Sequence, residues 1–120
     1  MQQFEDMRIW QDSRMLTGKI YRAFSNCKDF SFRDQIQRAA VSIINNISEG
    51  YERSSKAEFI RFLDIAKGSA GEVRSMLYLA QDLNYLGDKQ SNELIGEVLA
   101  ITKGIGALRK YLKNKEASNV

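Results

Sequence analysis

The sequence contains no histidine and no proline, and it has a single cysteine among its 120 residues. Without histidine, the chain lacks the commonest general base and the commonest transition-metal ligand. The lone Cys27 has no second cysteine for a disulfide and no histidine to activate its thiol, which fits a reducing cytoplasm. We therefore expect a protein that is not an enzyme, with no catalytic residues, no metal site and no cofactor.

Long hydrophobic runs are also missing. No apolar stretch approaches the roughly 20 residues that a membrane-spanning helix requires. Met1 is followed by polar and acidic residues and not by an apolar leader, so no secretory signal is expected. We expect a cytoplasmic protein without a membrane partner, folded as one domain over residues 1–120.

Apolar residues recur every three or four positions along most of the chain, which is typical of amphipathic helices. The spacing predicts four helices, over about residues 6–25, 32–52, 55–86 and 88–114. Four amphipathic helices with short connections predict an all-α, antiparallel up-down-up-down four-helix bundle.

Helix ends are indicated by capping residues. Ser31, with Asp34 three positions later, is the expected cap of the second helix. Ser55 and Glu58 form a capping box of the S-x-x-E type at the start of the third helix. Gly87 is expected to end the third helix as a C-cap.

The third helix carries two apolar lines. The first line is Phe59, Leu63, Ala66, Ala70, Val73, Leu77 and Ala80. The second line is Phe62, Ile65, Met76, Leu79 and Leu83. Because a helix of a monomeric bundle needs only one line, the second favours a homo-oligomer. The alternative is that both lines form the wide face of one buried helix.

Basic residues gather near the C-terminal end, although the net charge is only +3. They are Lys103, Arg109, Lys110, Lys113 and Lys115. One interpretation is that they offset the dipole at the end of the last helix. The other is a basic patch that contacts the phosphates of RNA or DNA.

A polar set lies on the second and third helices, comprising Asn46, Glu49, Arg53, Ser69 and Glu72. We interpret it as a hydrogen-bonded network that fixes helix register or subunit assembly. The alternative is a polar pocket for a small ligand or a nucleotide phosphate, with Glu49 and Glu72 the only candidates for acid–base work. The small residues from Gly68 to Gly71 predict close helix packing.

Three segments carry a resemblance to a known family: FEDMRIW, RAAVSIINNISEGYERSSKAEFIRFLDIAKGSAGEV and LYLAQDLNYL. They resemble the four-helix-bundle proteins encoded within 23S ribosomal RNA intervening sequences, over nearly the whole chain. One departure is Ile44, where the family usually has proline. Members of this family have often been labelled ribosomal proteins.

The resemblance implies a left-handed four-helix bundle that assembles into a ring, a pentamer. It also implies kinship with the accessory proteins of diversity-generating retroelements, whose basic barrel contacts nucleic acid and a reverse transcriptase. We therefore expect a non-enzymatic homo-oligomer that binds RNA or DNA weakly through basic helix ends. The alternative is a protein-binding scaffold, or an accessory subunit for a partner enzyme such as a reverse transcriptase.

Overall fold

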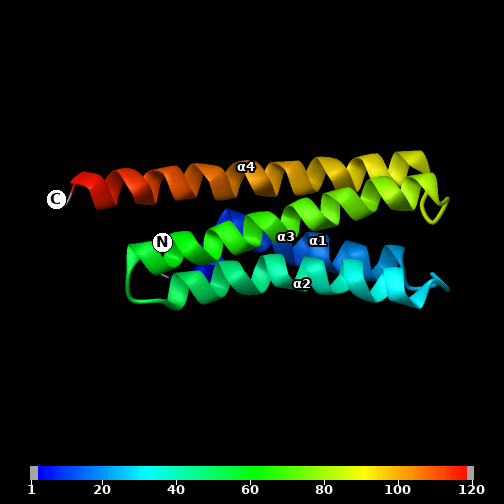
Figure 1. Ribbon diagram of the computed structural model, residues 1–120, viewed down its shortest axis with the longest axis horizontal. Helices are drawn as coiled ribbons and strands as arrows, with labels where there is room; N and C mark the ends of the chain where they lie inside the picture. The colour runs from blue at the N-terminus through cyan, green and yellow to red at the C-terminus, as the bar shows by residue number, and fades with distance from the viewer. Residues whose placement is uncertain (1–2, 119–120) are drawn as a thin grey trace.

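Four antiparallel helices make up the computed structural model, which describes residues 3–118, with side chains as far as Lys115. The elements are a short 3-10 helix η1 (Phe4–Asp6), α1 (Arg8–Ala23), α2 (Phe30–Glu52), α3 (Lys56–Asp82) and α4 (Asp88–Ser118). They run alternately up and down along a body 52 × 21 × 19 Å in extent (Figure 1). The predicted all-α four-helix bundle is confirmed, and residues 3–118 contain no strand.

The helices form a closed four-sided arrangement. α1 packs against α2 and α4, and α3 packs against the same two helices, with the α2–α3 contact the most extensive. Within the described residues, no Cα atoms of either diagonal pair lie within 8 Å of each other. Figure 1 shows the C-terminal end of α4 reaching past the ends of the other helices.

The core is built from the predicted apolar lines. Ile36, Ala40, Ile43 and Ile47 on α2 are completely buried. The first line of α3 is also completely buried from Leu63 to Ala80. Each large aliphatic side chain buried in this way stabilises the fold by about 1.5–3 kcal/mol.

The second apolar line of α3 is mostly outside this core. Met76 is buried, but Ile65, Leu79 and Leu83 are 40%, 47% and 51% exposed. The interpretation of both lines as one wide buried face is therefore wrong for these three side chains. They leave an apolar edge along α3 that no other helix of the protomer covers.

The predicted cap of α2 is wrong. Asp29, and not Ser31, is the N-cap, because its carboxylate accepts a hydrogen bond from the Phe32 backbone nitrogen at 3.2 Å. The helix consequently starts at Phe30, two residues earlier than predicted. Asp34 forms an ion pair with the neighbouring Arg33 at 3.2 Å. Both Asp and Ser are good N-caps, so composition alone could not choose between them.

The start of α3 is predicted correctly and its end is not. Ser55 Oγ accepts a hydrogen bond from the Glu58 backbone nitrogen at 3.1 Å, as the capping box requires. The helix ends at Asp82, because Asn84 takes the left-handed conformation (φ 60°) that was expected of Gly87. The Tyr85 nitrogen then bonds the Ala80 oxygen at 2.8 Å, closing a Schellman motif.

The outer helices also differ from their predicted ranges. α1 begins at Arg8, because residues 4–6 form η1, and it ends at Ala23. α4 continues to Ser118, four residues beyond the predicted end. None of the described helices is both long enough and apolar enough to cross a membrane.

Candidate functional site

The predicted polar set lies along the contact between α2 and α3, where it divides into separate contacts. At the middle of the helices, the Ser42 and Ser69 hydroxyls hydrogen-bond each other at 2.8 Å. Asn46 donates from its amide to the Ser42 carbonyl at 2.7 Å and to the Ser42 hydroxyl at 3.0 Å. Asn46 and Ser69 are thus joined through Ser42, and this contact ties the two helices at one level.

Glu72 belongs to a second contact. Its carboxylate accepts a hydrogen bond from the Gln35 amide at 3.2 Å, again across α2 and α3. Both side chains are exposed, so this contact lies on the surface of the bundle. Gln35 was missed by the sequence analysis, although it lies seven residues before Ser42 on the same helix face.

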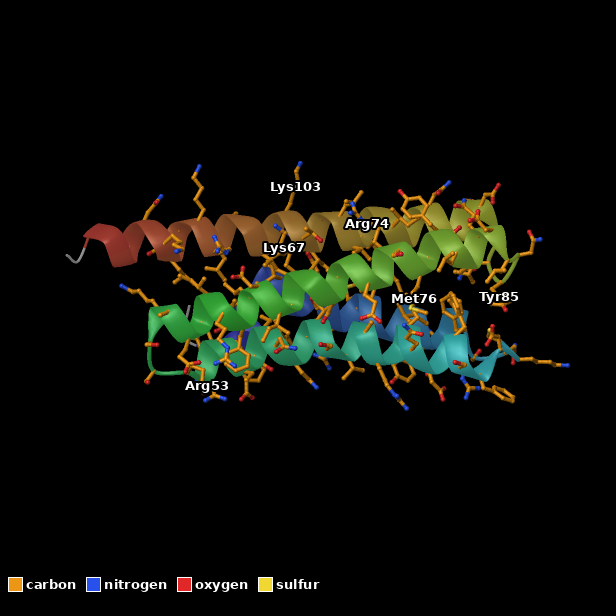
Figure 2. The ribbon with its side chains drawn as sticks, viewed as in Figure 1. Arg53, Lys67, Arg74, Met76, Tyr85 and Lys103 are labelled. Atoms are coloured by element: carbon orange, nitrogen blue, oxygen red, sulfur yellow. The ribbon has the colours of Figure 1, made fainter. Side chains whose placement is uncertain are left out.

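Glu49 and Arg53 form a third contact near the end of α2. They pair with each other at 2.6 Å, one helical turn apart. The Arg53 guanidinium also lies over the Phe62 ring of α3, at 4.9 Å from the ring centre. Arg53 and Tyr85 lie at opposite ends of the bundle in Figure 2. The five predicted residues therefore contribute to three links between α2 and α3.

A groove of about 590 Å³ opens beside the first two of these contacts. Its lining residues are Ser31, Asp34, Gln35, Arg38, Ala39, Ser42, Ser69 and Glu72. Its charge is mixed, with two carboxylates and one arginine. Glu49 lies outside the groove, so the groove does not bring together the two carboxylates that were considered for acid–base work.

The small residues between Gly68 and Gly71 do not pack as predicted. Ala70 is buried and Ser69 contacts α2, but a Cβ added to Gly68 or Gly71 would meet no atom within 4 Å. The close approach of α2 and α3 occurs at Gly50, where an added Cβ would lie 2.8 Å from the Phe62 Cβ. Gly68 and Gly71 thus face open space within the protomer.

The predicted basic residues of α4 fall into two groups. Lys103, Lys110 and Lys113 are exposed, and they form no ion pair within the described part of the chain. Arg109 donates to the Asp64 carboxylate of α3 at 2.6 Å, and this hydrogen bond raises the pKa of Arg109 above its usual value. Lys115 lies near the Tyr111 ring, with its Nζ 6.0 Å from the ring centre.

Two further cations on α3 extend this surface, and the sequence analysis missed them. Figure 2 shows Lys67 and Arg74 along the junction of α3 and α4, with Lys103 pointing outward from α4. Both are exposed and have no ion-pair partner among residues 3–118. Their spacing of seven residues puts them on one face of α3. We call Lys67, Arg74, Lys103, Lys110 and Lys113 the basic face.

Two hydrogen bonds show the register of α3 against α4. One joins Asp64 to Arg109, and the other joins Gln81 to Asn92 at 3.4 Å. Seventeen residues separate the two contacts on each helix, so the register is constant between them. It places Lys67 opposite Gly106, one turn from both Lys103 and Lys110 on α4.

Three acidic residues on the same helices are turned toward other helices or are paired. Glu72 of α3 bonds α2, and Glu97 of α4 pairs with Lys19 of α1 at 2.9 Å. Asp64 is held by Arg109. The charges are therefore segregated: the junction of α3 and α4 keeps its cations, while these carboxylates are turned away or paired.

Neither the cysteine nor the carboxylates form a reactive cluster among the described residues. Cys27 is partly exposed, and its Sγ lies 3.8 Å from the Asp29 carbonyl oxygen. In the same range, no group of three or more His, Cys, Asp or Glu side chains is placed to hold a metal ion.

The fold and surface describe a small all-helical protein with one cationic face and one uncovered apolar edge. A family model described as 23S rRNA-intervening sequence protein matches residues 5–107. The chain belongs to this family.

A solved structure supports the same assignment. The chain is similar to a protein of unknown function from the S23 ribosomal protein family of Bacteroides thetaiotaomicron, at 27% identity and a TM-score of 0.80. The alignment covers 85% of this chain and 98% of that chain. The comparison with curated proteins gave no match.

Proposed function

We propose that this protein is a non-enzymatic, ring-forming homo-oligomer of the cytoplasm whose basic face binds the phosphate backbone of RNA or DNA. The observation that carries the proposal is the segregation of charge. Five exposed cations line the junction of α3 and α4, while Glu72 and Glu97 bond other helices and Asp64 is paired. Such a surface attracts phosphate without reading base sequence.

The affinity is expected to be weak and dependent on salt. Binding to Z phosphates gives a slope of about −0.7Z for single strands and −0.9Z for duplexes in a plot of log K against log salt. Five cations therefore predict a slope of roughly −3 to −5. An affinity that does not change between low and moderate salt, or no binding at either, contradicts the proposal.

Assembly is proposed through the uncovered apolar edge of α3. Ile65, Leu79 and Leu83 are exposed there, and Gly68 leaves open space between them. A glycine in an exposed helix costs about 1 kcal/mol relative to alanine, and close approach of a second copy accounts for tolerating it. The family resemblance favours a pentameric ring.

The assembly and nucleic-acid surfaces lie on different sides of α3. Glu72 bonds α2, and Ile65 lies seven residues before it on the same face of α3, whereas Lys67 and Arg74 lie toward α4. A ring built on the apolar edge would therefore repeat the basic face once per subunit. Multiple copies raise avidity for a long polyanion even when each site is weak.

The second candidate function is a protein-binding scaffold, or an accessory subunit of an enzyme such as a reverse transcriptase. The mixed-charge groove of about 590 Å³ between α2 and α3 favours it, because Arg38 lines this groove with no ion-pair partner among residues 3–118. Recovery of one specific protein partner after nuclease treatment, lost on Arg38→Glu, supports this function. Recovery that disappears with nuclease supports the nucleic-acid function.

A further inference from the structure

An exposed tyrosine continues the basic face of α3. Tyr78 is 51% exposed, and within the described residues it makes no hydrogen bond and no ring contact. It lies one helical turn beyond Arg74, on the side of α3 that faces α4. A tyrosine ring held by a rigid helix without a partner is a large flat surface that costs little entropy to order on binding.

The α4 side of this position is open. The register places Ile95 and Gly96 opposite Tyr78, and it places Leu99 opposite Arg74. A Cβ added to Gly96 would meet no atom within 4 Å, and Leu99 is 41% exposed. Tyr78 and Leu99 are therefore two exposed apolar side chains about one helical turn apart along the junction, at the level of Arg74, which has no ion-pair partner among the described residues.

We propose that the basic face takes single-stranded nucleic acid, with a base stacked on Tyr78. This inference rests on the proposed function, and it names the form of nucleic acid that the face prefers. Aromatic rings beside cations are the means by which proteins hold unpaired bases without selecting sequence. A duplex keeps its bases stacked inside, so it can use the cations and cannot use Tyr78.

The spacing of the cations fits a strand that runs along the helices. Lys67 and Arg74 are separated by about 10 Å along α3, and Lys103 and Lys110 are separated by the same rise along α4. A strand lying on this face has its phosphates beside these four cations and one base at Tyr78. The Tyr78 side chain lies at the edge of the basic face, next to Arg74.

The test compares two forms of one RNA on the full chain. The probes are a single strand of about 20 nucleotides and its blunt duplex, with affinities measured at the same low salt. The variants are Tyr78→Ala, Tyr78→Phe and, as a matched control, Tyr21→Ala, which removes a tyrosine that is 45% exposed on α1. Thermal unfolding verifies that each variant is folded.

The expected result is tighter binding of the single strand. Tyr78→Ala weakens single-strand binding about fivefold or more and leaves duplex binding within about twofold. Tyr78→Phe keeps the ring and retains the affinity, and Tyr21→Ala has no effect. An RNA carrying 5-iodouridine crosslinks to Tyr78 on irradiation, with the adduct located by mass spectrometry.

Two other results separate the two proposals. If the strand and the duplex bind equally, with a normal salt slope and no effect of Tyr78→Ala, the stacking inference is overturned and the phosphate-binding function stands. If neither RNA binds at low salt, both are overturned.

Discussion

Arg109 and Asp64 join α4 to α3 through a hydrogen bond of 2.6 Å, with a second, longer contact of 3.4 Å between the same groups. The pair lies at the register that aligns Lys67 with Lys103 and Lys110, and it removes one cation and one carboxylate from the basic face. Arg109 therefore acts as a structural residue, and it differs from Lys103, Lys110 and Lys113 on α4.

A charge-neutral double variant tests this role. Asp64→Asn combined with Arg109→Gln is expected to bind RNA with the same affinity and salt slope as the native protein, because both charges of the pair disappear together. Lys103→Gln is the contrast, with a slope reduced in magnitude by about 0.7–0.9. The measurement is fluorescence anisotropy across a salt series. A double variant that loses as much slope as Lys103→Gln contradicts this role.

Asp64→Asn alone is expected to change RNA affinity in the direction opposite to Lys103→Gln. It frees the Arg109 guanidinium and removes the one carboxylate that contacts it. We expect tighter RNA binding and a slope increased in magnitude by about 0.7–0.9, measured in the same assay. Weaker binding by a folded Asp64→Asn protein would count against phosphate contact at this face.

Two glycine substitutions are expected to have opposite effects on stability. Gly50→Ala puts a Cβ 2.8 Å from the Phe62 Cβ and 3.3 Å from the Phe59 carbonyl oxygen, so it destabilises the fold by about 1–3 kcal/mol. Gly71→Ala meets no atom within 4 Å and stabilises the exposed helix by up to about 1 kcal/mol. Urea unfolding measures both. A Gly50→Ala protein as stable as the native one contradicts the packing described at this position.

The Tyr85 hydroxyl donates a hydrogen bond of 2.6 Å to the Asp29 carboxylate, linking the α1–α2 and α3–α4 connections. The bond lowers the pKa of Asp29 and raises the pKa of Tyr85. Because the folded pKa of Asp29 is below its ordinary 3.8, this stabilisation is present above that pH and is lost as the pH falls further. Because the folded pKa of Tyr85 is above its ordinary 10.0, the stabilisation from the Tyr85 hydroxyl is present below pH 10.0 and is lost as the pH rises further.

Tyr85→Phe is therefore expected to lower stability at pH 7. The difference from the native protein should shrink below the ordinary pKa of Asp29 and also above pH 10.0. Thermal unfolding of both proteins at about pH 2.5, 7 and 10.5 measures the difference in stability. A difference that stays constant over this range would show that Tyr85 acts through packing alone, as in its contact with the Phe32 ring at 5.2 Å.

Assembly through the apolar edge of α3 makes a separate prediction. Leu79→Lys is expected to reduce the particle mass in solution toward that of the 13.7 kDa chain, because a lysine cannot be buried between two copies at low cost. Met15→Lys is the control, since Met15 is 59% exposed on α1, away from this edge. Light scattering gives the masses. A native protein that is already monomeric contradicts the proposed ring.

The parts of the fold that the sequence predicted correctly depend on local spacing. The buried line of α3 follows from a repeat of three and four, and the Ser55–Glu58 box involves residues three positions apart. The errors occur where neighbours compete for one role. Asp29 and Ser31 are both good caps, and Asn84 takes the left-handed position three residues before Gly87.

The site was less predictable, because its members are brought together by helix register. Lys103 and Lys110 were found from their C-terminal clustering, whereas Lys67 and Arg74 lie in a stretch whose total charge is balanced. Lys67 and Arg74 differ from Glu72 in the side of α3 on which they lie: the two cations face α4, and Glu72 faces α2. A helical projection of α3 groups its residues by face. It does not tell which face packs against α2 and which against α4, and that is known only from the contacts in the structure.

The most direct test of the account is the salt dependence of RNA binding with and without the basic face. The first variant changes Lys67, Arg74, Lys103 and Lys110 to Gln. The control variant changes Arg14, Arg22, Lys28 and Lys89 to Gln, which removes equal charge elsewhere. The first variant is expected to lose most of the affinity and to have a slope smaller in magnitude by about 3, while the control keeps nearly all of the slope. Equal losses in the two variants would contradict nucleic-acid binding through the basic face.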